Sequence, residues 1–146
     1  IIQLAGFILA RDAAQAHSET AGHAGVAQAT TGLLRLLPIH RRRGQLYVPA
    51  DMLASVGVTR EAFFANDDPS ACERVVSVML ALAREHQAIF DKAKATLPKS
   101  LAPAFLPMAI VPAYLKAIER LGGKAAERTA DISAIRKKWL MFRANF

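Results

Sequence analysis

The chain has 146 residues, 53% of them hydrophobic, and its 19 Lys and Arg against 12 Asp and Glu give a net charge of +7. This length suits one domain with a substantial core, and the charge favours anionic partners such as phosphate groups, anionic lipid surfaces or nucleic acid. The single cysteine, Cys72, excludes an internal disulfide and a cysteine-based metal cage.

The N-terminal segment IIQLAGFILA is apolar and lacks an initial methionine. It is too short to cross a bilayer, which takes about 20 residues, and it has no basic region or cleavage site of a signal peptide. We therefore expect residues 1–10 to be a helix whose earlier part is missing, and the chain to be a fragment or a processed product.

Helical spacing of apolar residues dominates the first half of the chain, and strand-like alternation is almost absent. The expected elements after the first helix are a link at 11–17, a helix at 18–37, a cationic loop at 40–44, an extended segment at 47–49 and a short helix at 50–55. Ser18 with Glu19 is expected to cap the helix at 18–37, Pro38 to end it, and Gly57 to end the short helix. Glycines at 22, 25 and 32 indicate an inner helix that packs closely or lines a cavity.

The second half is also predicted to be helical. The expected elements are a helix from Thr59 to about Asn66, the longest helix from Asp68-Pro69 to about Ala95, a helix from Ser100 to Gly122-Gly123, a polar connection at 124–130 and a closing helix from Ile132 to about Asn145. Pro107 and Pro112 should bend the helix that follows Ser100, and Asp131 should cap the closing helix. We expect a single all-α domain spanning residues 1–146.

Residues 28–49 carry motifs in an order that resembles the squalene/phytoene synthase family. The matching residues are Gln28, Thr30, Leu34-Arg35, Arg42-Arg43-Gly44 and Tyr47-Val48-Pro49. Members of that family carry a Q-L-T-N-I-L-R-D-x-x-E-D-x-x-x-G-R-x-Y-L-P stretch late in an all-helical fold. The resemblance implies a helical bundle of the isoprenoid (terpenoid) synthase type, of which this chain would be the C-terminal half.

The segment at 20–50 contains no acidic residue. In the resembling enzymes the second acidic motif binds magnesium, which neutralises a diphosphate so that it can leave. Counted without gaps from Arg35, the acidic positions of that motif fall on Leu36, Ile39 and His40. Magnesium prefers hard oxygen ligands, which these side chains do not supply. The comparison implies a family member that has lost the second metal-binding motif.

A branch of the same family, which contains the mitochondrial respiratory complex I assembly factor of squalene/phytoene-synthase type, is more similar still. Its corresponding stretch keeps an L-R-x-x-P-x-H pattern, basic residues and then L-P-x-D, matched here by Leu34, Arg35, Pro38, His40, Arg43, Pro49 and Asp51. This resemblance implies a pseudoenzyme that assists complex I assembly as a peripheral membrane protein. The implied partners are a prenyl or other anionic lipid and complex I subunits. The expected location is cytoplasmic, peripheral on the inner membrane of a bacterium, or on the matrix side of a mitochondrion.

Six residues form the predicted substrate- or anion-binding set: Gln28, Arg35, His40, Arg42, Arg43 and Tyr47. Each has a structural interpretation as well. In this interpretation, His40 is an exposed loop residue, and Arg42 and Arg43 belong to a solvated turn. Arg35 pairs with a buried acid, Gln28 is a satisfied interior amide, and Tyr47 is a packing residue. No residue is predicted to be catalytic or to bind a metal, and no cofactor is expected.

Other chemically capable residues are interpreted as structural. His86 is not predicted to bind a metal, because no second ligand recurs on the same helical face. Cys72 lies near a predicted helix start, where a thiol pKa can be lowered, but no nearby histidine indicates a nucleophile. The pairs Phe63-Phe64 and Trp139-Phe142 are expected in the core or at an interface.

The alternative function is a transferase that condenses two prenyl diphosphates head to head in isoprenoid biosynthesis. It would use magnesium at a first acidic motif outside this chain, with Arg35, Arg43 and Tyr47 holding the diphosphate. Nucleic-acid binding is disfavoured, because no helix-turn-helix or zinc pattern accompanies the charge. A half bundle would expose apolar faces, so we also expect a homo-oligomer.

Overall fold

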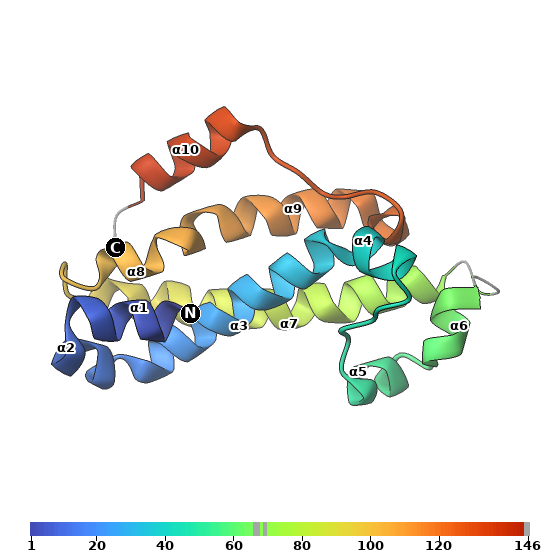
Figure 1. The fold of residues 1–146 in the computed structure, drawn as a ribbon, viewed down its shortest axis with the longest axis horizontal. Coiled ribbons are helices and arrows are strands. Elements are labelled where there is room, and N and C mark those ends of the chain that lie inside the picture. The colour runs from blue at the N-terminus through green and yellow to red at the C-terminus, as the bar shows by residue number, and fades with distance from the viewer. Residues whose placement is uncertain (66–67, 69, 145–146) are drawn as a thin grey trace.

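The computed structural model describes residues 1–65, 68 and 70–144, and all regular elements within these residues are helices (Figure 1). They are α1 (Ile2–Leu9), α2 (Arg11–Ala16), α3 (Ser18–Arg35), α4 (Leu37–Arg42), α5 (Ala50–Ser55), α6 (Arg60–Ala65), α7 (Ala71–Ala93), η1 (Lys94–Thr96), α8 (Ala102–Phe105), η2 (Leu106–Ile110), α9 (Val111–Leu121), η3 (Gly122–Ala126) and α10 (Ala134–Phe142). The all-α prediction is confirmed.

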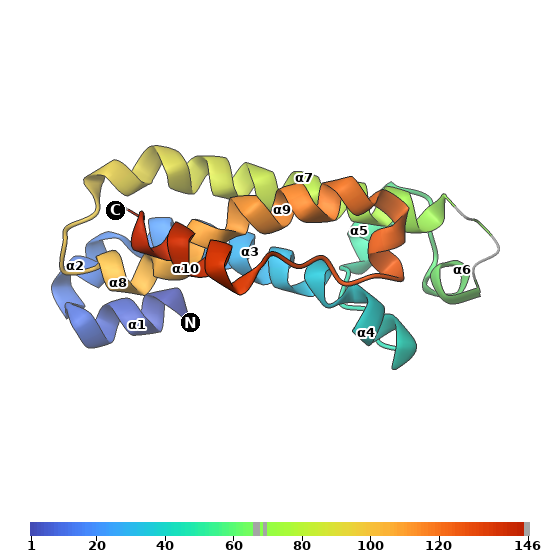
Figure 2. The same ribbon diagram turned by 90° about the horizontal axis from the view of Figure 1, so that it is seen from above.

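The core is built on the packing of α3 against α7, with α9 alongside (Figures 1 and 2). Helix α7 is 23 residues long, and its buried residues recur every three or four positions. The facing side of α3 is made of small residues, including the buried Ala21, Ala24 and Ala27, which let two helix axes approach closely. The predicted close packing of α3 is therefore made by alanines. A Cβ added at Gly22, Gly25 or Gly32 would meet nothing within 4 Å.

Three expectations for the first half are wrong. Residues 11–17 are mostly helix α2, and the next helix begins at Ser18 itself, with no side-chain cap. The helix ends at Arg35, and residues 40–42 of the predicted cationic loop belong to helix α4, whereas Arg43 and Gly44 form a turn. Pro38 lies in the first turn of α4, where the missing N–H breaks no hydrogen bond, so it starts a helix instead of ending one.

The later elements follow the prediction more closely. Helix α5 has the predicted bounds, and Gly57 after it has a φ of +66°. The N–H of Ala62 donates to Thr59 Oγ1 at 3.1 Å, so Thr59 caps α6 as expected. Helix α7 is also the longest described helix. The predicted end of α6 at Asn66 and the start signal at Pro69 lie outside the described residues.

The segment from Ser100 to Gly122 consists of three consecutive helical pieces. Pro103, Pro107 and Pro112 each lie in the first turn of one piece, α8, η2 and α9. Gly122 ends α9 with a φ of +52°, as its predicted role requires. The first three residues of the predicted polar connection, 124–126, belong to the 3-10 helix η3, which contributes buried alanines to the core.

The closing helix α10 begins later than predicted. Its cap is Ser133, whose hydroxyl accepts a hydrogen bond from the N–H of Arg136, and not Asp131. The carboxylate of Asp131 instead accepts from the N–H of Ile132 and pairs with Lys137. The predicted end at Asn145 lies outside the described residues.

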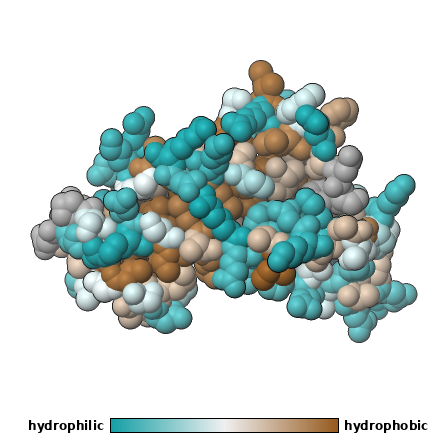
Figure 3. All heavy atoms as spheres, turned by 180° about the vertical axis from the view of Figure 1, so that it is seen from behind, coloured by the Kyte–Doolittle hydropathy of each residue, from teal (hydrophilic) through white to brown (hydrophobic). Residues whose placement is uncertain are grey.

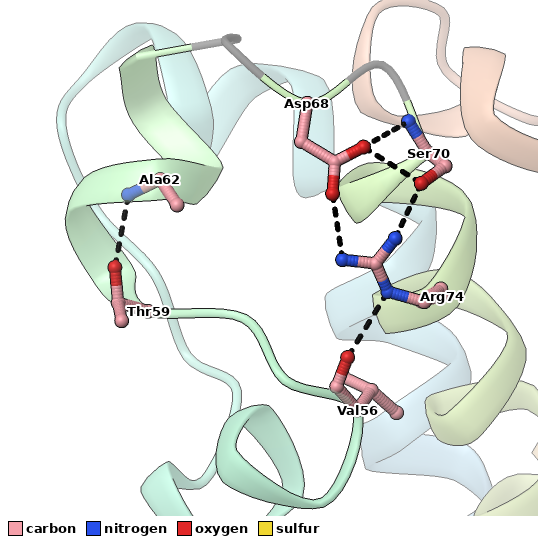
Figure 4. A network of polar contacts seen from close by, with 6 residues as sticks. All are labelled: Val56, Thr59, Ala62, Asp68, Ser70 and Arg74. Carbon is pink, nitrogen blue, oxygen red and sulfur yellow. Dashed lines mark hydrogen bonds and ion pairs between the residues drawn. The ribbon is translucent and has the colours of Figure 1, made fainter.

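A polar network fixes the start of α7 against the preceding loop (Figure 4). Asp68 accepts hydrogen bonds from the N–H and hydroxyl of Ser70 and pairs with Arg74 at 2.7 Å. Arg74 also donates to the carbonyl of Val56 at 3.0 Å. The hydrogen bonds from Ser70 and Arg74 lower the pKa of Asp68 from 3.8 to about 2. This network ties α5 and α7 together across α6.

The molecule exposes more surface than a compact protein of the same mass. Its accessible surface is 8454 Å², whereas a compact chain of 15.8 kDa exposes about 7,300 Å². Apolar surface interrupts the hydrophilic side chains on the reverse face, including the upper edge of the view, where α10 lies (Figure 3). Within the described residues, no helix has both the length and the apolar character needed to cross a bilayer.

Candidate functional site

The positions that resemble the second acidic motif lie at the junction of α3 and α4. Leu36 separates the two helices and is half-buried, Ile39 is 38% exposed, and His40 is half-buried. Together they offer one imidazole and no carboxylate. In the described part of the chain, no group of three or more His, Cys, Asp and Glu residues is placed to hold a metal ion. The donor set at this junction therefore does not fit magnesium, which takes oxygen ligands.

His40 and Tyr47 form an aromatic pair beside this junction. Their ring centroids are 4.8 Å apart and the rings meet edge to face at 76°. Tyr47 is 51% exposed, so the pair borders solvent. The hollow next to it has a volume of about 10 Å³ and is lined by Leu33, Leu34, Leu37, His40, Tyr47, Val48 and Met79. This volume is close to that of one water molecule, and a prenyl chain does not fit there.

The arginines that follow His40 divide between structural and exposed positions. Arg41 donates to the carbonyl of Phe63 at 3.3 Å, and its Cζ atom lies 5.5 Å from the Phe63 ring centroid. Arg42 and Arg43 are exposed at the C-terminal end of α4, where positive charge complements the helix dipole. Within the predicted set, these two side chains are the exposed cations, since Arg35 is half-buried.

The guanidinium of Arg35 stacks on an aromatic ring and makes no ion pair with a described acid. Its Cζ atom lies 4.9 Å from the ring centroid of Tyr114, and its Nε atom is buried without a hydrogen-bond partner among the described residues. No described acid pairs with Arg35, so the predicted pairing with a buried acid is wrong. Gln28 lies two turns earlier on the same face of α3, about 10.5 Å along the axis. It is half-buried rather than interior.

Arg35 belongs to a cluster that sequence reasoning did not find. Tyr114 donates its hydroxyl to Asp131 at 3.2 Å, and Lys137 pairs with Asp131 at 2.8 Å, with its ammonium 5.6 Å from the Tyr114 ring centroid. The hydrogen bond from Lys137, followed by that from the N–H of Ile132, lowers the pKa of Asp131, and the same Asp131 contact raises the pKa of Lys137. The cluster joins three segments far apart in sequence, so no local spacing could have indicated it.

The six predicted residues therefore lie in three places. Gln28 and Arg35 share a face of α3, His40 packs against Tyr47, and Arg42 and Arg43 extend from the end of α4. Their role in binding a ligand stays a prediction.

Two further residues singled out in the sequence have unexpected surroundings. His86 meets His23 across the interface of α3 and α7, with their Nδ1 atoms 2.9 Å apart. The partner of His86 thus comes from another helix, which the spacing within one helix could not reveal. Cys72 is buried, and burial raises the pKa of its thiol. The position near a helix start does not lower this pKa, because desolvation of the thiolate has the larger effect.

The aromatic pairs differ from each other. Phe63 is fully buried and meets Phe64 edge to face, with centroids 5.6 Å apart. Trp139 and Phe142 are 55% and 86% exposed. Phe63 lies in the core as predicted and the partly buried Phe64 packs against the core, whereas the exposure of Trp139 and Phe142 excludes the core interpretation for that pair.

The fold is all-helical, and the junction of α3 and α4 keeps the motif order described above but has no acid at Leu36, Ile39 or His40. The sequence profile of the squalene/phytoene synthase family matches residues 1–142, and the chain belongs to this family. The predicted resemblance is confirmed.

Three mammalian proteins that match the chain share one name. The chain is 31% identical over 101 residues to NADH dehydrogenase (ubiquinone) complex I, assembly factor 6, of Mus musculus, and equally to that of Rattus norvegicus. The Homo sapiens protein of the same name is 29% identical over 101 residues. Each match covers 69% of this chain and 30% of the relative, so the matched region is under a third of the relatives' length. These names agree with the predicted branch. No solved structure matches the chain significantly.

Proposed function

We propose that the protein is a catalytically silent member of the squalene/phytoene synthase family that takes part in assembling respiratory complex I. The observation that carries this proposal is the junction of α3 and α4, where Leu36, Ile39 and His40 stand in place of magnesium-binding carboxylates. The names of the mouse, rat and human relatives support the assembly role. We propose that residues 1–146 form part of one larger domain of the family.

The proposed partners are complex I subunits and a prenyl or other anionic lipid at a membrane surface. The exposed guanidinium groups of Arg42 and Arg43 suit a phosphate or carboxylate, which arginine binds with two parallel hydrogen bonds. Gln28, Arg35, His40 and Tyr47 complete the proposed binding set. The protein would bind peripherally, on the inner membrane of a bacterium or on the matrix side of a mitochondrion. Exposed apolar residues of α1, such as Leu4 and Ile8, support a covering by further protein, including a homo-oligomer.

The assembly role is tested by deleting the gene in the source organism and measuring complex I in its membranes by native electrophoresis. We expect assembled complex I to fall and the full-length protein to restore it. A full-length Arg42→Gln/Arg43→Gln variant should restore it poorly, because the proposed anion contacts are lost. The matched control, Arg11→Gln/Arg120→Gln, removes the same charge from exposed positions on α2 and α9 and should restore it fully. An unchanged level of complex I after deletion would refute the assembly role.

The loss of catalysis is tested separately. Purified full-length protein is incubated with magnesium and farnesyl or geranylgeranyl diphosphate, and the extract is analysed for longer prenyl products. We expect none, because the α3 and α4 junction lacks oxygen ligands for the metal. A condensed product would establish the alternative, a head-to-head prenyl transferase with its metal at another acidic motif.

A further inference from the structure

Helix α10 exposes its large apolar side chains, although Trp139 also lines a pocket between α10 and the body of the protein. Ile135, Trp139 and Phe142 are 81%, 55% and 86% exposed, and no residue of α10 is buried. Their spacing of four and three residues places them on one side of the helix, which we name the outward face of α10. This orientation is the reverse of a typical surface helix, which turns its apolar side toward the core.

The opposite side of α10 holds the helix on the protein. Lys137 is half-buried and reaches Asp131 at 2.8 Å, beside the ring of Tyr114. Leu140 and Met141 lie on the same side and are also half-buried. Helix α10 packs on η2, along the outside of the α8 to α9 segment (Figures 1 and 2). The outward face therefore belongs to a docked helix and not to a detached one.

Basic side chains border the outward face on both edges. Arg136 and Arg143 follow one edge and Lys138 the other, and all three are exposed. No acid occurs in residues 132–146. The Cζ atom of Arg143 lies 5.4 Å from the ring centroid of Trp139, so a cation and an indole are paired at the edge. An apolar centre with cationic edges is the pattern that binds anionic lipid surfaces.

Other occupants match this face less well. A symmetric contact between two copies would place the same basic residues opposite one another, with no acid on the face to offset the repulsion. Nucleic acid is bound mainly through its phosphates, whereas the centre of this face is apolar. We infer that the outward face of α10 docks on the surface of an anionic lipid bilayer, with its apolar side chains in the interface and its basic side chains against the headgroups. This inference rests on the membrane association in the proposed function and names the element responsible for it.

The experiment measures binding of the full-length protein to sedimented vesicles of phosphatidylcholine containing phosphatidylglycerol. We expect the variant Ile135→Gln/Trp139→Gln/Phe142→Gln to bind about 100-fold more weakly, since it removes the apolar centre. The control, Val26→Gln, changes an exposed apolar residue of α3. It should bind like the unmodified protein. Circular dichroism confirms that both variants fold.

A second variant tests the cationic edges. Arg136→Gln/Lys138→Gln/Arg143→Gln should lose about 100-fold in affinity at low salt, because each basic residue near an anionic surface contributes roughly fivefold. If this variant binds the vesicles as tightly as the unmodified protein, the basic side chains do not contribute to binding and the inference is overturned.

Three other results would also overturn it, for different reasons. If the unmodified protein does not bind the vesicles, the membrane part of the proposed function fails with the inference. If the unmodified protein binds and the apolar variant of α10 binds with equal affinity, the inference alone fails, and another surface contacts the membrane. If the protein is a dimer that the apolar variant separates, a second copy covers this face. The complex I measurement after gene deletion is independent of all these outcomes.

Discussion

Helices α4 and α10 are both short and strongly basic, yet the structure places their cations and their apolar residues differently. In α4, Leu37 and Pro38 are buried, and Arg41 is held by the carbonyl and the ring of Phe63. In α10, no residue is buried and the large apolar side chains face outward. The comparison teaches that charge alone does not assign a role to a basic helix. The role of such a helix also depends on whether its apolar residues are buried in the core or face outward.

The largest expected difference is between the phenylalanines associated with the two helices. Phe63→Ala should lower the free energy of unfolding by about 3–5 kcal/mol, because Phe63 is fully buried beneath Arg41. Phe142→Ala should change it by less than about 0.5 kcal/mol, because Phe142 is 86% exposed. Urea denaturation of both variants measures the two values. A comparable loss for Phe142→Ala would mean that α10 is covered by protein.

A smaller difference in stability is expected between variants that remove one cation from α4 or from α10. Arg41→Met should destabilise the protein by about 1 kcal/mol, since it removes the hydrogen bond to the Phe63 carbonyl and the contact with the ring. Lys138→Met, a matched removal of one charge from the exposed edge of α10, should stay within about 0.5 kcal/mol of the unmodified protein. The comparison fails if thermal and urea denaturation give equal losses for the two variants.

The smallest effect concerns the ion pair that holds α10. The pKa of Asp131 is lowered below its ordinary value of 3.8 by Lys137 and by the N–H of Ile132. A lowered folded-state pKa means that the contribution of Asp131 is present above about pH 4 and is lost as the pH falls through the folded value. The stability difference between the unmodified protein and Asp131→Asn should therefore shrink as the pH is lowered from 5 to 2, a range set by these titrations. Lys137→Met should reduce the same acid dependence, and an unchanged profile in both variants would contradict the role of the pair.

The sequence predicted those parts of the fold that depend on local signals. Thr59 capped α6, Gly57 and Gly122 took positive φ, and the apolar spacing of α7 gave the longest helix. The start of α4 was not predicted, because a proline in a helical pattern can end one helix or begin the next. Only the packing of Leu37 and Pro38 decides between the two.

The candidate site was predictable in its residues and not in its surroundings. The motif order identified the junction at Leu36, Ile39 and His40, because the family's pattern is continuous in sequence there. The stacking of Arg35 on Tyr114 and the pair of Asp131 with Lys137 depend on tertiary packing. The reversed orientation of α10 was equally hidden, because an amphipathic pattern gives the width of an apolar side and not the direction in which it points.

The burial of Cys72 in the first turn of α7 has a consequence for how the opening of this region can be observed. A buried thiol with a raised pKa reacts slowly with alkylating reagents while α7 stays docked. Because Cys72 is the chain's single cysteine, its labelling would time the separation of this turn from the bundle. The rate of Cys72 labelling would therefore report local unfolding at the end of the molecule where α4, α6 and α7 meet.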